Sequence, residues 1–235
     1  MFSVIEIEIN SNCNRKCIYC PNSKIGDKDI PLYMENEVQT KIIEELKMLN
    51  FTGRLSYHFY NEPLLHPSLE NIVKIFSDVL PETRQVLYTN GDFLTDYKYD
   101  SLVKNGIQHF IVTQHDSKNI SVRPLQTVLM PENLNKTNRG GTLGRLENAL
   151  ASPCFVPSTM IIVTVIGDVL YCYEDAQRKY VMGNVMKNSL KEIWFSKKYN
   201  EIRKQLELGN RNINEMCKVC NNTAHPSPGQ FDFVY

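Results

Sequence analysis

Cys13, Cys17 and Cys20 stand close together near the start of the 235-residue sequence, at spacings of four and three residues. They follow residues 4–9, Val-Ile-Glu-Ile-Glu-Ile, whose alternation predicts a half-buried strand with apolar residues on one face and carboxylates on the other. Three thiolates in one loop can hold three irons of a four-iron, four-sulfur cluster and leave the fourth iron open. We therefore expect a metal centre with an open coordination position just after the first strand.

The later four of the seven cysteines predict a second metal centre. These are Cys154, Cys172, Cys217 and Cys220. An odd number of cysteines does not suit a disulfide framework, and scattered core cysteines would not fall into two groups. Four thiolates form a closed site that can pass an electron but has no iron left for a ligand. A structural zinc ion is an alternative for these four, but it explains the first three poorly because a fourth ligand is missing.

The composition excludes several other classes of function. The 26 basic and 26 acidic residues cancel, so nothing predicts binding to nucleic acid or to an anionic membrane surface. Glu6 and Glu8 interrupt the N-terminal apolar stretch, which argues against a signal peptide. The longest apolar run, residues 160–166, is too short to span a bilayer. We expect a soluble, cytoplasmic protein.

The sequence alternates between predicted strands and helices, and these elements are expected to position the first three cysteines. After the first strand, the pattern predicts strands at residues 55–60, 85–88, 107–113 and 125–130, with helices at 34–50, 68–80 and 96–105. Polar residues gather where each strand ends, as in parallel barrels, whose chemistry lies at the C-terminal ends of the strands. There are too few units for eight strands. We predict a partial, open TIM-like β/α barrel of about five or six strands over residues 1–145.

The pattern changes after Asn138-Arg139-Gly140-Gly141. Residues 159–166 and 169–172 flank a Gly-Asp pair and predict a β-hairpin. Residues 189–208 predict one amphipathic helix. We expect residues 146–235 to form a small α+β domain that brings the four later cysteines together. Residues 117–136 support no clear structural prediction apart from the strand at 125–130.

The first cysteine motif, with an aromatic residue before its last cysteine, resembles the signature of the radical S-adenosylmethionine (SAM) enzymes. Tyr60-Asn61-Glu62-Pro63 resembles the Gly-Glu-Pro element of that family, with Asn61 in place of the usual glycine. Asparagine tolerates a positive φ, so we expect the turn to survive. Residues 180–185 and 192–194 resemble the twitch domain, which holds an auxiliary cluster. The resemblance implies SAM and two [4Fe-4S] clusters as cofactors.

Longer strings resemble the family of 2-deoxy-scyllo-inosamine dehydrogenase, from the biosynthesis of the aminoglycoside antibiotic butirosin. They run along nearly the whole chain, at residues 7–11, 20–23, 56–60, 88–94, 138–141, 154–158, 172–175 and 217–222. The resemblance implies an oxidoreductase that converts a secondary alcohol of an aminocyclitol to a ketone without nicotinamide. A 5′-deoxyadenosyl radical would remove hydrogen from the alcohol carbon, and the substrate radical would pass one electron to the closed cluster.

The resemblance also implies roles for individual side chains. Cys13, Cys17 and Cys20 would hold the SAM-binding cluster, and the other four cysteines the auxiliary one. The residues implied to bind SAM are Tyr19, Glu62, Asn90 and Gln114, and those implied to line the substrate are Tyr60, Tyr88, Arg139, Tyr173 and Glu174. Arg139 would stabilise the developing alkoxide, because a guanidinium keeps its proton far above neutral pH. His115 is an alternative base or a strand-end hydrogen bonder.

Three other functions stay open. An epimerase would need a cysteine thiol to return hydrogen to the substrate, whereas all seven cysteines are expected to be cluster ligands. A twitch enzyme that modifies a peptide would suit a chain with a peptide-recognition domain before the barrel. A zinc-stabilised binding protein would have no catalytic role. The radical reaction would also need an external one-electron reductant such as flavodoxin or ferredoxin. The stretch between His115 and Asn138 is shorter than the resemblance leads us to expect, so the reaction class transfers better than the substrate.

Overall fold

One eight-stranded sheet runs through the chain in a computed structural model that describes residues 1–25, 32–116, 120–134, 136–225 and 227. The strand order is β5-β4-β3-β2-β1-β6-β7-β8. The strands are β1 Val4–Ile7, β2 Arg54–Ser56, β3 Arg84–Thr89, β4 His109–Thr113, β5 Gln126–Leu129, β6 Met160–Val163, β7 Asp168–Leu170 and β8 Val181–Asn184. The helices are α1 Asn36–Met48, α2 Leu69–Val79, α3 Asp96–Asn105, α4 Val156–Thr159, α5 Leu190–Trp194, α6 Lys197–Glu207 and α7 Glu215–Val219.

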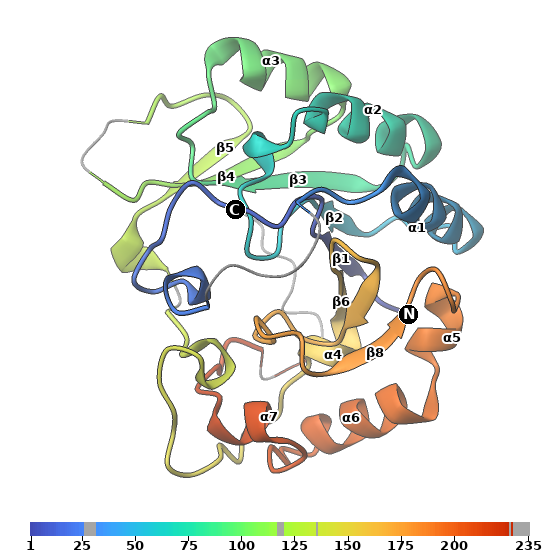
Figure 1. Cartoon of the computed structure of the whole chain (residues 1–235), viewed down its shortest axis with the longest axis vertical. Coiled ribbons are helices and arrows are strands. Elements are labelled where there is room, and N and C mark those ends of the chain that lie inside the picture. Colours follow the sequence, from blue (N-terminus) through green and yellow to red (C-terminus); the bar gives the residue numbers. More distant parts are fainter. Residues whose placement is uncertain (26–31, 117–119, 135, 226, 228–235) are drawn as a thin grey trace.

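The six strands from β5 to β6 are all parallel, and β7 and β8 continue the sheet in antiparallel fashion. Helices α1, α2 and α3 connect the first four strands and lie together on the outer side of the sheet (Figure 1). The sheet does not close, since β5 and β8 are its two edges. This arrangement confirms the predicted partial, open barrel, and its parallel strands bring their C-terminal ends to one edge.

Strand β1 is buried on both faces, so the prediction of a half-buried strand with exposed carboxylates is wrong. All four of its residues are buried, and Glu8, just beyond the strand, is fully buried as well. The reason is that β1 is a central strand of a parallel sheet, paired along both edges with β2 and β6, and such strands are buried on both faces. Glu8 accepts hydrogen bonds from Arg178 at 2.7 Å and from the backbone N–H of Val165 at 3.0 Å. The two carboxylates of this stretch therefore point into the protein.

The predicted helix over residues 189–208 is also wrong in one respect, because it is two helices, α5 and α6. The helix is interrupted at Ser196. The hydroxyl of Ser196 accepts a hydrogen bond from the backbone N–H of Tyr199 at 3.2 Å and so begins a new helix. At the start of α5, Ser189 and Glu192 form a reciprocal capping box. Local side-chain capping thus outweighs the continuous amphipathic pattern.

The two predicted parts of the chain share this sheet. The predicted hairpin is present as β6 and β7, with Gly167 at a φ of 83° in its turn. Strand β6 pairs in parallel with β1, with Ile5 opposite Ile161. The hydrophobic core therefore continues from the barrel into the C-terminal part. The boundary between residues 145 and 146 stays a prediction.

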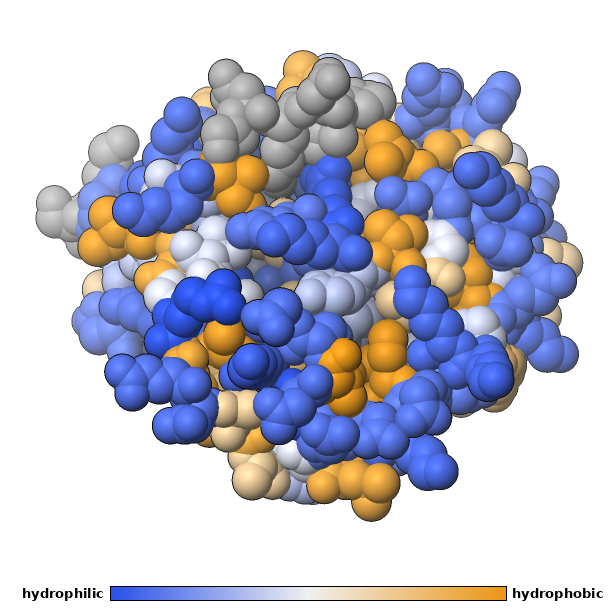
Figure 2. All heavy atoms as spheres, turned by 60° about the horizontal axis from the view of Figure 1, so that its bottom comes forward, coloured by the Kyte–Doolittle hydropathy of each residue, from blue (hydrophilic) through white to orange (hydrophobic). Residues whose placement is uncertain are grey.

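The surface gives no sign of a membrane-spanning element. In the described ranges, no helix combines the length and the apolar composition needed to cross a bilayer. The face brought forward in Figure 2, which is the lower end of Figure 1, is mostly hydrophilic, and its hydrophobic residues lie in small separate groups.

Candidate active site

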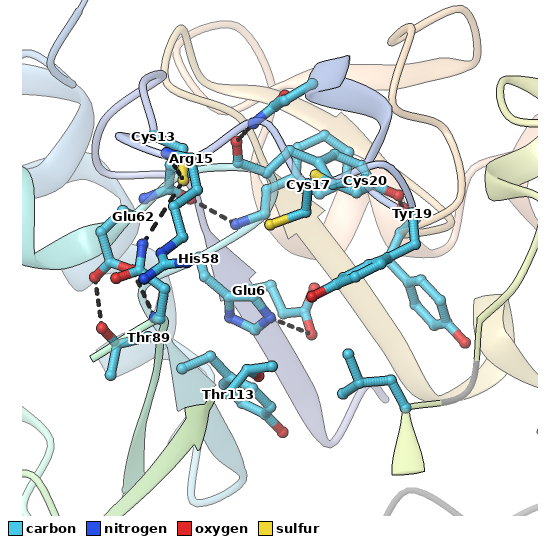
Figure 3. A pocket seen from close by; sticks show the side chains of 18 of the residues that line it. Glu6, Cys13, Arg15, Cys17, Tyr19, Cys20, His58, Glu62, Thr89 and Thr113 are labelled. Atoms are coloured by element: carbon cyan, nitrogen blue, oxygen red, sulfur yellow. Dashed lines mark hydrogen bonds and ion pairs between the residues drawn. The ribbon is translucent and has the colours of Figure 1, made fainter. Parts of the chain in front are cut away.

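A cavity of about 370 Å³ lies at the C-terminal ends of the parallel strands, beneath the loop that carries the first three cysteines (Figure 3). Its walls come from both parts of the chain. Strand β1, the segment after β2 and the ends of β3 and β4 supply one side, and Arg139, Met160 and Tyr173 supply the other. This is the edge of a parallel barrel at which chemistry is expected.

Cys13, Cys17 and Cys20 lie together along this cavity, and each is partly exposed. The loop between them is tied to the strands below by Arg15. Its Nε donates to Asp92 Oδ2 at 2.7 Å, beyond β3, and its Nη2 donates to Asp116 Oδ2 at 2.9 Å, beyond β4. Arg15 therefore holds the cysteine loop over the strand ends, a role that the sequence analysis missed.

Glu62 and Asn90, both implied to bind SAM, line the cavity beside the cysteines. Glu62 Oε1 accepts from Leu64 N at 3.0 Å and from Thr89 Oγ1 at 2.7 Å, and Glu62 Oε2 accepts from Asn90 N at 2.8 Å. Burial nevertheless raises the pKa of Glu62 to about 7, against the effect of these donors. The carboxylate is thus held rigidly by the turn after β2 and the end of β3.

Asn61, which replaces the usual glycine, does not use a positive φ, so the reason given for its tolerance is wrong. Its side chain holds the turn instead. Asn61 Oδ1 accepts from Phe59 N at 2.8 Å, and Asn61 Nδ2 donates to Asn10 Oδ1 at 2.8 Å. These hydrogen bonds connect the turn after β2 to the segment that leads into the cysteine loop.

Tyr19 also lines the cavity, whereas Gln114 does not. The Tyr19 hydroxyl is hydrogen bonded to His115 Nδ1, and the two rings stack with centroids 5.9 Å apart. His115 Nδ1 lies 3.5 Å from Cys17 Sγ. Thr113 at the end of β4 and His115 line the cavity, whereas Gln114 lines a neighbouring recess that His115 also borders, and its amide donates to Asp116 O at 3.1 Å.

Four of the five residues implied to line the substrate, Tyr60, Tyr88, Arg139 and Tyr173, lie along the cavity. The Tyr60 hydroxyl donates to Tyr173 O at 2.7 Å and so connects the two parts of the chain. The guanidinium of Arg139 lies 5.9 Å from the centre of the Tyr60 ring. Its Nε is buried without a hydrogen-bond partner in the described part of the chain. Arg139 therefore has an unused donor beside the cavity.

The backbone at Arg139 is strained in a way that often marks a functional position. Its φ is 49°, in the left-handed region that non-glycine residues seldom adopt, and Gly140 follows with a φ of 57°. The Cβ of a side chain at Gly140 would lie 2.8 Å from Glu174 O, so this turn packs directly on the segment after Cys172. The turn directs Arg139 toward the cavity.

Glu174, the fifth residue implied to bind substrate, is buried behind the cavity rather than along it. Its carboxylate accepts from Thr137 Oγ1 at 2.8 Å and from Asn222 Nδ2 at 2.9 Å. Asn222 Nδ2 also donates to the Tyr173 hydroxyl at 2.6 Å. Glu174 therefore joins the wall of the cavity to the second group of cysteines.

The second group of cysteines surrounds a small recess that is closed to solvent. Cys154 precedes α4, Cys172 follows β7, and Cys217 and Cys220 lie on α7 and at its end. The four are 6–9% exposed. Much of the recess wall is apolar, and the apolar side chains are Val156, Pro157, Leu206 and Met216. The arrangement matches a closed centre.

Arg211, which the sequence analysis missed, ties the chain around these cysteines. It is buried, and its guanidinium donates to Ser152 O at 3.0 Å and to Asn222 O at 2.9 Å. The two carbonyls belong to the segments that carry Cys154 and Cys220. No local sequence signal distinguishes Arg211 from a surface arginine, because its partners are distant in the sequence.

Two histidines and two charged residues of the cavity were also missed. They are Glu6, Arg54, His58 and His225. Arg54 donates to the Tyr88 hydroxyl at 2.6 Å, and His225 Nε2 lies 2.8 Å from the Tyr173 hydroxyl. Only Glu6 had a signal in the sequence, as a carboxylate near the end of an apolar strand. The others are recognisable only once the strands are assembled.

Single metal ions and iron–sulfur clusters require different spacings of the cysteine sulfurs. A zinc ion needs its ligands within about 2.3 Å of one point. Among the described residues, no three His, Cys, Asp or Glu side chains converge closely enough to hold one ion. In a cluster each thiolate binds a different iron, so the sulfurs stand further apart. Burial raises the pKa of Cys13 to about 11 and that of Cys220 to about 12, so these thiols stay neutral until iron displaces the proton.

Comparison with known families agrees with this division. The profile of the Radical SAM superfamily matches residues 7–168, which include the first cysteine group. The profile of SPASM, an iron–sulfur cluster-binding domain, matches residues 154–221, which include the second group. The cofactors are therefore SAM and two [4Fe-4S] clusters, as predicted.

Individual relatives resemble the chain over its full length. The S-adenosyl-L-methionine-dependent 2-deoxy-scyllo-inosamine dehydrogenase of Niallia circulans is 39% identical, with 100% of this chain and 98% of that protein covered. The crystal structure of BtrN in complex with AdoMet and 2-DOIA superposes with a TM-score of 0.92 at 39% identity and covers 100% of this chain and 99% of that one. BtrN in an open conformation gives 0.81 at 38% identity, with the same coverage of both chains. The chain belongs to the radical SAM superfamily and, within it, to the family of the SAM-dependent 2-deoxy-scyllo-inosamine dehydrogenase.

Proposed function

We propose that the protein oxidises a secondary alcohol of an aminocyclitol, 2-deoxy-scyllo-inosamine or a close relative, to a ketone. The observation that carries this proposal is one cavity that lies between an open and a closed cysteine group and is lined by polar side chains from both parts of the chain. The full-length relative with this activity supports the same substrate class. The cavity volume of about 370 Å³ suits a small polar ring beside SAM.

SAM, when bound at the first group, supplies a 5′-deoxyadenosyl radical that removes one hydrogen atom from the alcohol carbon. The residues of the chain bind and orient the two ligands. Tyr19, Glu62 and Asn90 lie where they can contact SAM beside the cysteines. Gln114 faces away from the cavity, so it would need to act through the segment that follows β4.

Arg139 and the tyrosines would hold the substrate. Tyr60, Tyr88 and Tyr173 present hydroxyl groups or ring faces to the cavity, and Glu174 fixes the wall behind them. The unused Nε–H of Arg139 can donate to an alkoxide as negative charge develops on the substrate oxygen. The permanent positive charge of Arg139 stabilises the negative charge on the substrate oxygen. A cluster held by the second cysteine group would accept the electron.

The cysteine positions argue against the other candidate functions. Every cysteine belongs to one of the two groups, so an epimerase would lack a free thiol to return hydrogen. The absence of a disulfide among the seven cysteines fits the reducing cytoplasm, where we place the protein.

We further propose that flavodoxin or ferredoxin supplies the first electron, and that residues 1–145 and 146–235 act as two domains.

The deciding experiment is anaerobic incubation with SAM, a reductant and 2-deoxy-scyllo-inosamine. We expect 5′-deoxyadenosine and a ketone in equal amounts. Substrate deuterated at the reacting carbon should transfer deuterium to the 5′-deoxyadenosine. Deoxyadenosine without a ketone from any aminocyclitol would refute the proposed substrate class, and no deoxyadenosine at all would refute the reaction type.

A further inference from the structure

Glu6 stands out among the three carboxylates at or behind the cavity because, among the described residues, its oxygens accept no hydrogen bond and make only long ion pairs. Glu62 accepts hydrogen bonds from three groups, and Glu174 accepts them from Thr137 and Asn222. Within the described part of the chain, no donor reaches Glu6 at hydrogen-bond distance; its nearest charged neighbour, Arg54 Nη2, is 3.7 Å away. Glu6 therefore lines the cavity with oxygens that can accept a hydrogen bond from a ligand.

The position of Glu6 directs this capacity toward the substrate. It is the third residue of β1, the strand that leads into the first cysteine loop. Figure 3 shows Glu6 and His58 pointing toward each other below the three cysteines, and His58 Nε2 lies 3.8 Å from Glu6 Oε1. A substrate hydroxyl between the cysteine loop and the strands would meet this carboxylate.

Four titratable or charged groups from three neighbouring elements surround Glu6. Arg54 lies in β2 and His58 lies in the segment after it. Arg139 lies in the short turn Arg139–Gly141. Tyr88 of β3 stacks on His58 with centroids 4.2 Å apart and accepts a hydrogen bond from Arg54. On the other side, β6 contributes the apolar Met160 to the cavity wall.

These surroundings make Glu6 able to exchange a proton near neutral pH. Burial raises its pKa to about 7, although Arg54 and Arg139 act in the opposite direction. Burial lowers the pKa of His58 to about 3, with Arg54 and Arg139 acting in the same direction, so that ring stays neutral. Arg139 keeps its proton throughout. An effective general base has a pKa near the working pH, and Glu6 is the group in this cluster that meets this condition.

The proposed oxidation requires a proton acceptor that Arg139 cannot provide. We propose that Glu6 accepts the hydroxyl proton of the substrate, an inference that rests on the proposed function. In the balanced reaction, the C–H bond breaks and its hydrogen atom goes to the SAM-derived radical. The O–H bond breaks and its proton goes to Glu6, one electron goes to an oxidised iron–sulfur cluster, and C=O forms. Glu6 returns its proton to water when the ketone leaves.

The first test is the isosteric variant Glu6→Gln in the anaerobic, cluster-loaded enzyme. We expect 5′-deoxyadenosine to form still, with ketone formation reduced by about 100-fold or more, the usual contribution of a general base. Glu6→Asp, which keeps a carboxylate, should recover part of the ketone. In the wild type, ketone formation should rise with pH through about 7, because Glu6 must be ionised to accept a proton, and in Glu6→Gln this rise should be lost. Ketone formation at the wild-type rate, or an unchanged pH profile, would overturn the assignment.

A second measurement needs no turnover and separates a base from a partner of the substrate ammonium group. Calorimetric titration near pH 7 in two buffers of different ionisation enthalpy counts the protons released when a ligand binds. A hydroxyl that donates to Glu6 favours the ionised carboxylate, so both the aminocyclitol and the cyclitol without the amine should release protons in the wild type and none in Glu6→Gln. If protons were released only when the amine-bearing ligand binds, the role of Glu6 as the base would be overturned. A wild type that makes no ketone from any aminocyclitol would instead refute the proposed function itself.

Discussion

The two cysteine groups use the same side chain in opposite surroundings. The first group is partly exposed along a cavity of about 370 Å³ that also holds ionisable residues. The second group is 6–9% exposed, in a recess whose wall is largely apolar and is also bordered by Glu174 and Arg211. A ligand can therefore reach the first centre. The second centre is shielded from ligands and is suited to electron transfer. Cysteine count alone would make the two sites look alike, and it is the packing around them that separates a site of bond cleavage from a site of electron transfer.

Polar contacts to sulfur are a feature that the two groups share. In the second group the backbone N–H groups of Glu174 and Asn222 each lie 3.4 Å from a cysteine sulfur, and the Tyr171 hydroxyl lies 3.2 Å from Cys217 Sγ. In the first group Arg15 N lies 3.4 Å from Cys13 Sγ, Asn90 Nδ2 lies 3.9 Å from the same sulfur, and His115 Nδ1 lies 3.5 Å from Cys17 Sγ. Hydrogen bonds to the sulfurs are one of the factors that set the reduction potential of a cluster. Both sites therefore have nearby polar groups that can tune a cluster, and burial is what distinguishes the second site.

The largest effect should come from breaking the open site. In Cys17→Ala we expect no 5′-deoxyadenosine and no ketone, because SAM would lose the cluster that reduces it. The iron content should fall from about eight to about four per chain, since the second site is separate. Product chromatography and iron analysis of anaerobically purified protein measure both. Deoxyadenosine at the wild-type rate would contradict the assignment of the open site.

Breaking the closed site should separate the two half-reactions. In Cys172→Ala we expect SAM cleavage to persist and net oxidation to stop, because the substrate radical would have no electron acceptor. The measurement is deoxyadenosine against ketone in the same reaction mixture. Ketone formation at the full rate would show that the second group does not accept the electron.

A buried carboxylate beside the open site should also lower stability in a pH-dependent way. The folded-state pKa of Glu6 is raised from 4.5 to about 7, so the fold disfavours its ionised form and loses stability as pH rises from 4.5 through 7. The free energy of unfolding of Glu6→Gln should therefore be about 3 kcal/mol higher than that of the wild type at pH 8. At pH 6 this difference should be about 1 kcal/mol smaller. Anaerobic denaturant titrations at the two pH values measure this. An equal or lower stability of the variant at pH 8 would contradict it.

The smallest effect should come from a contact that joins the surroundings of the two sites. Tyr60→Phe removes the hydroxyl that donates to Tyr173 O, next to Cys172. We expect a loss of about 1 kcal/mol in the free energy of unfolding, the net value of one hydrogen bond. Tyr97→Phe is the matched control, because Tyr97 is 82% exposed and its change should lie within about 0.5 kcal/mol. Equal stability of the two variants would show that the contact contributes nothing.

Some features can be predicted from sequence because they depend on local spacing. The loop of Cys13, Cys17 and Cys20 holds its ligands within a few residues, so the open centre is visible in the sequence. The alternation of strands and helices similarly predicts the open parallel sheet. The prediction of a single helix over residues 189–208 is wrong because the amphipathic period continues across Ser196, where the side-chain cap on Tyr199 N begins a second helix.

The sequence by itself determined the two centres, the parallel sheet between them and the family to which the chain belongs. Only the tertiary structure decided which side chains meet in the cavity, since Gln114, just beyond β4, lies in a neighbouring recess, and the burial of Glu6 depends on segments far from β1 in the sequence that pack around it. Ligand spacing and hydrophobic period are properties of neighbouring residues. Burial, and with it the pKa of a carboxylate, depends on residues far apart in the chain and exists only after folding.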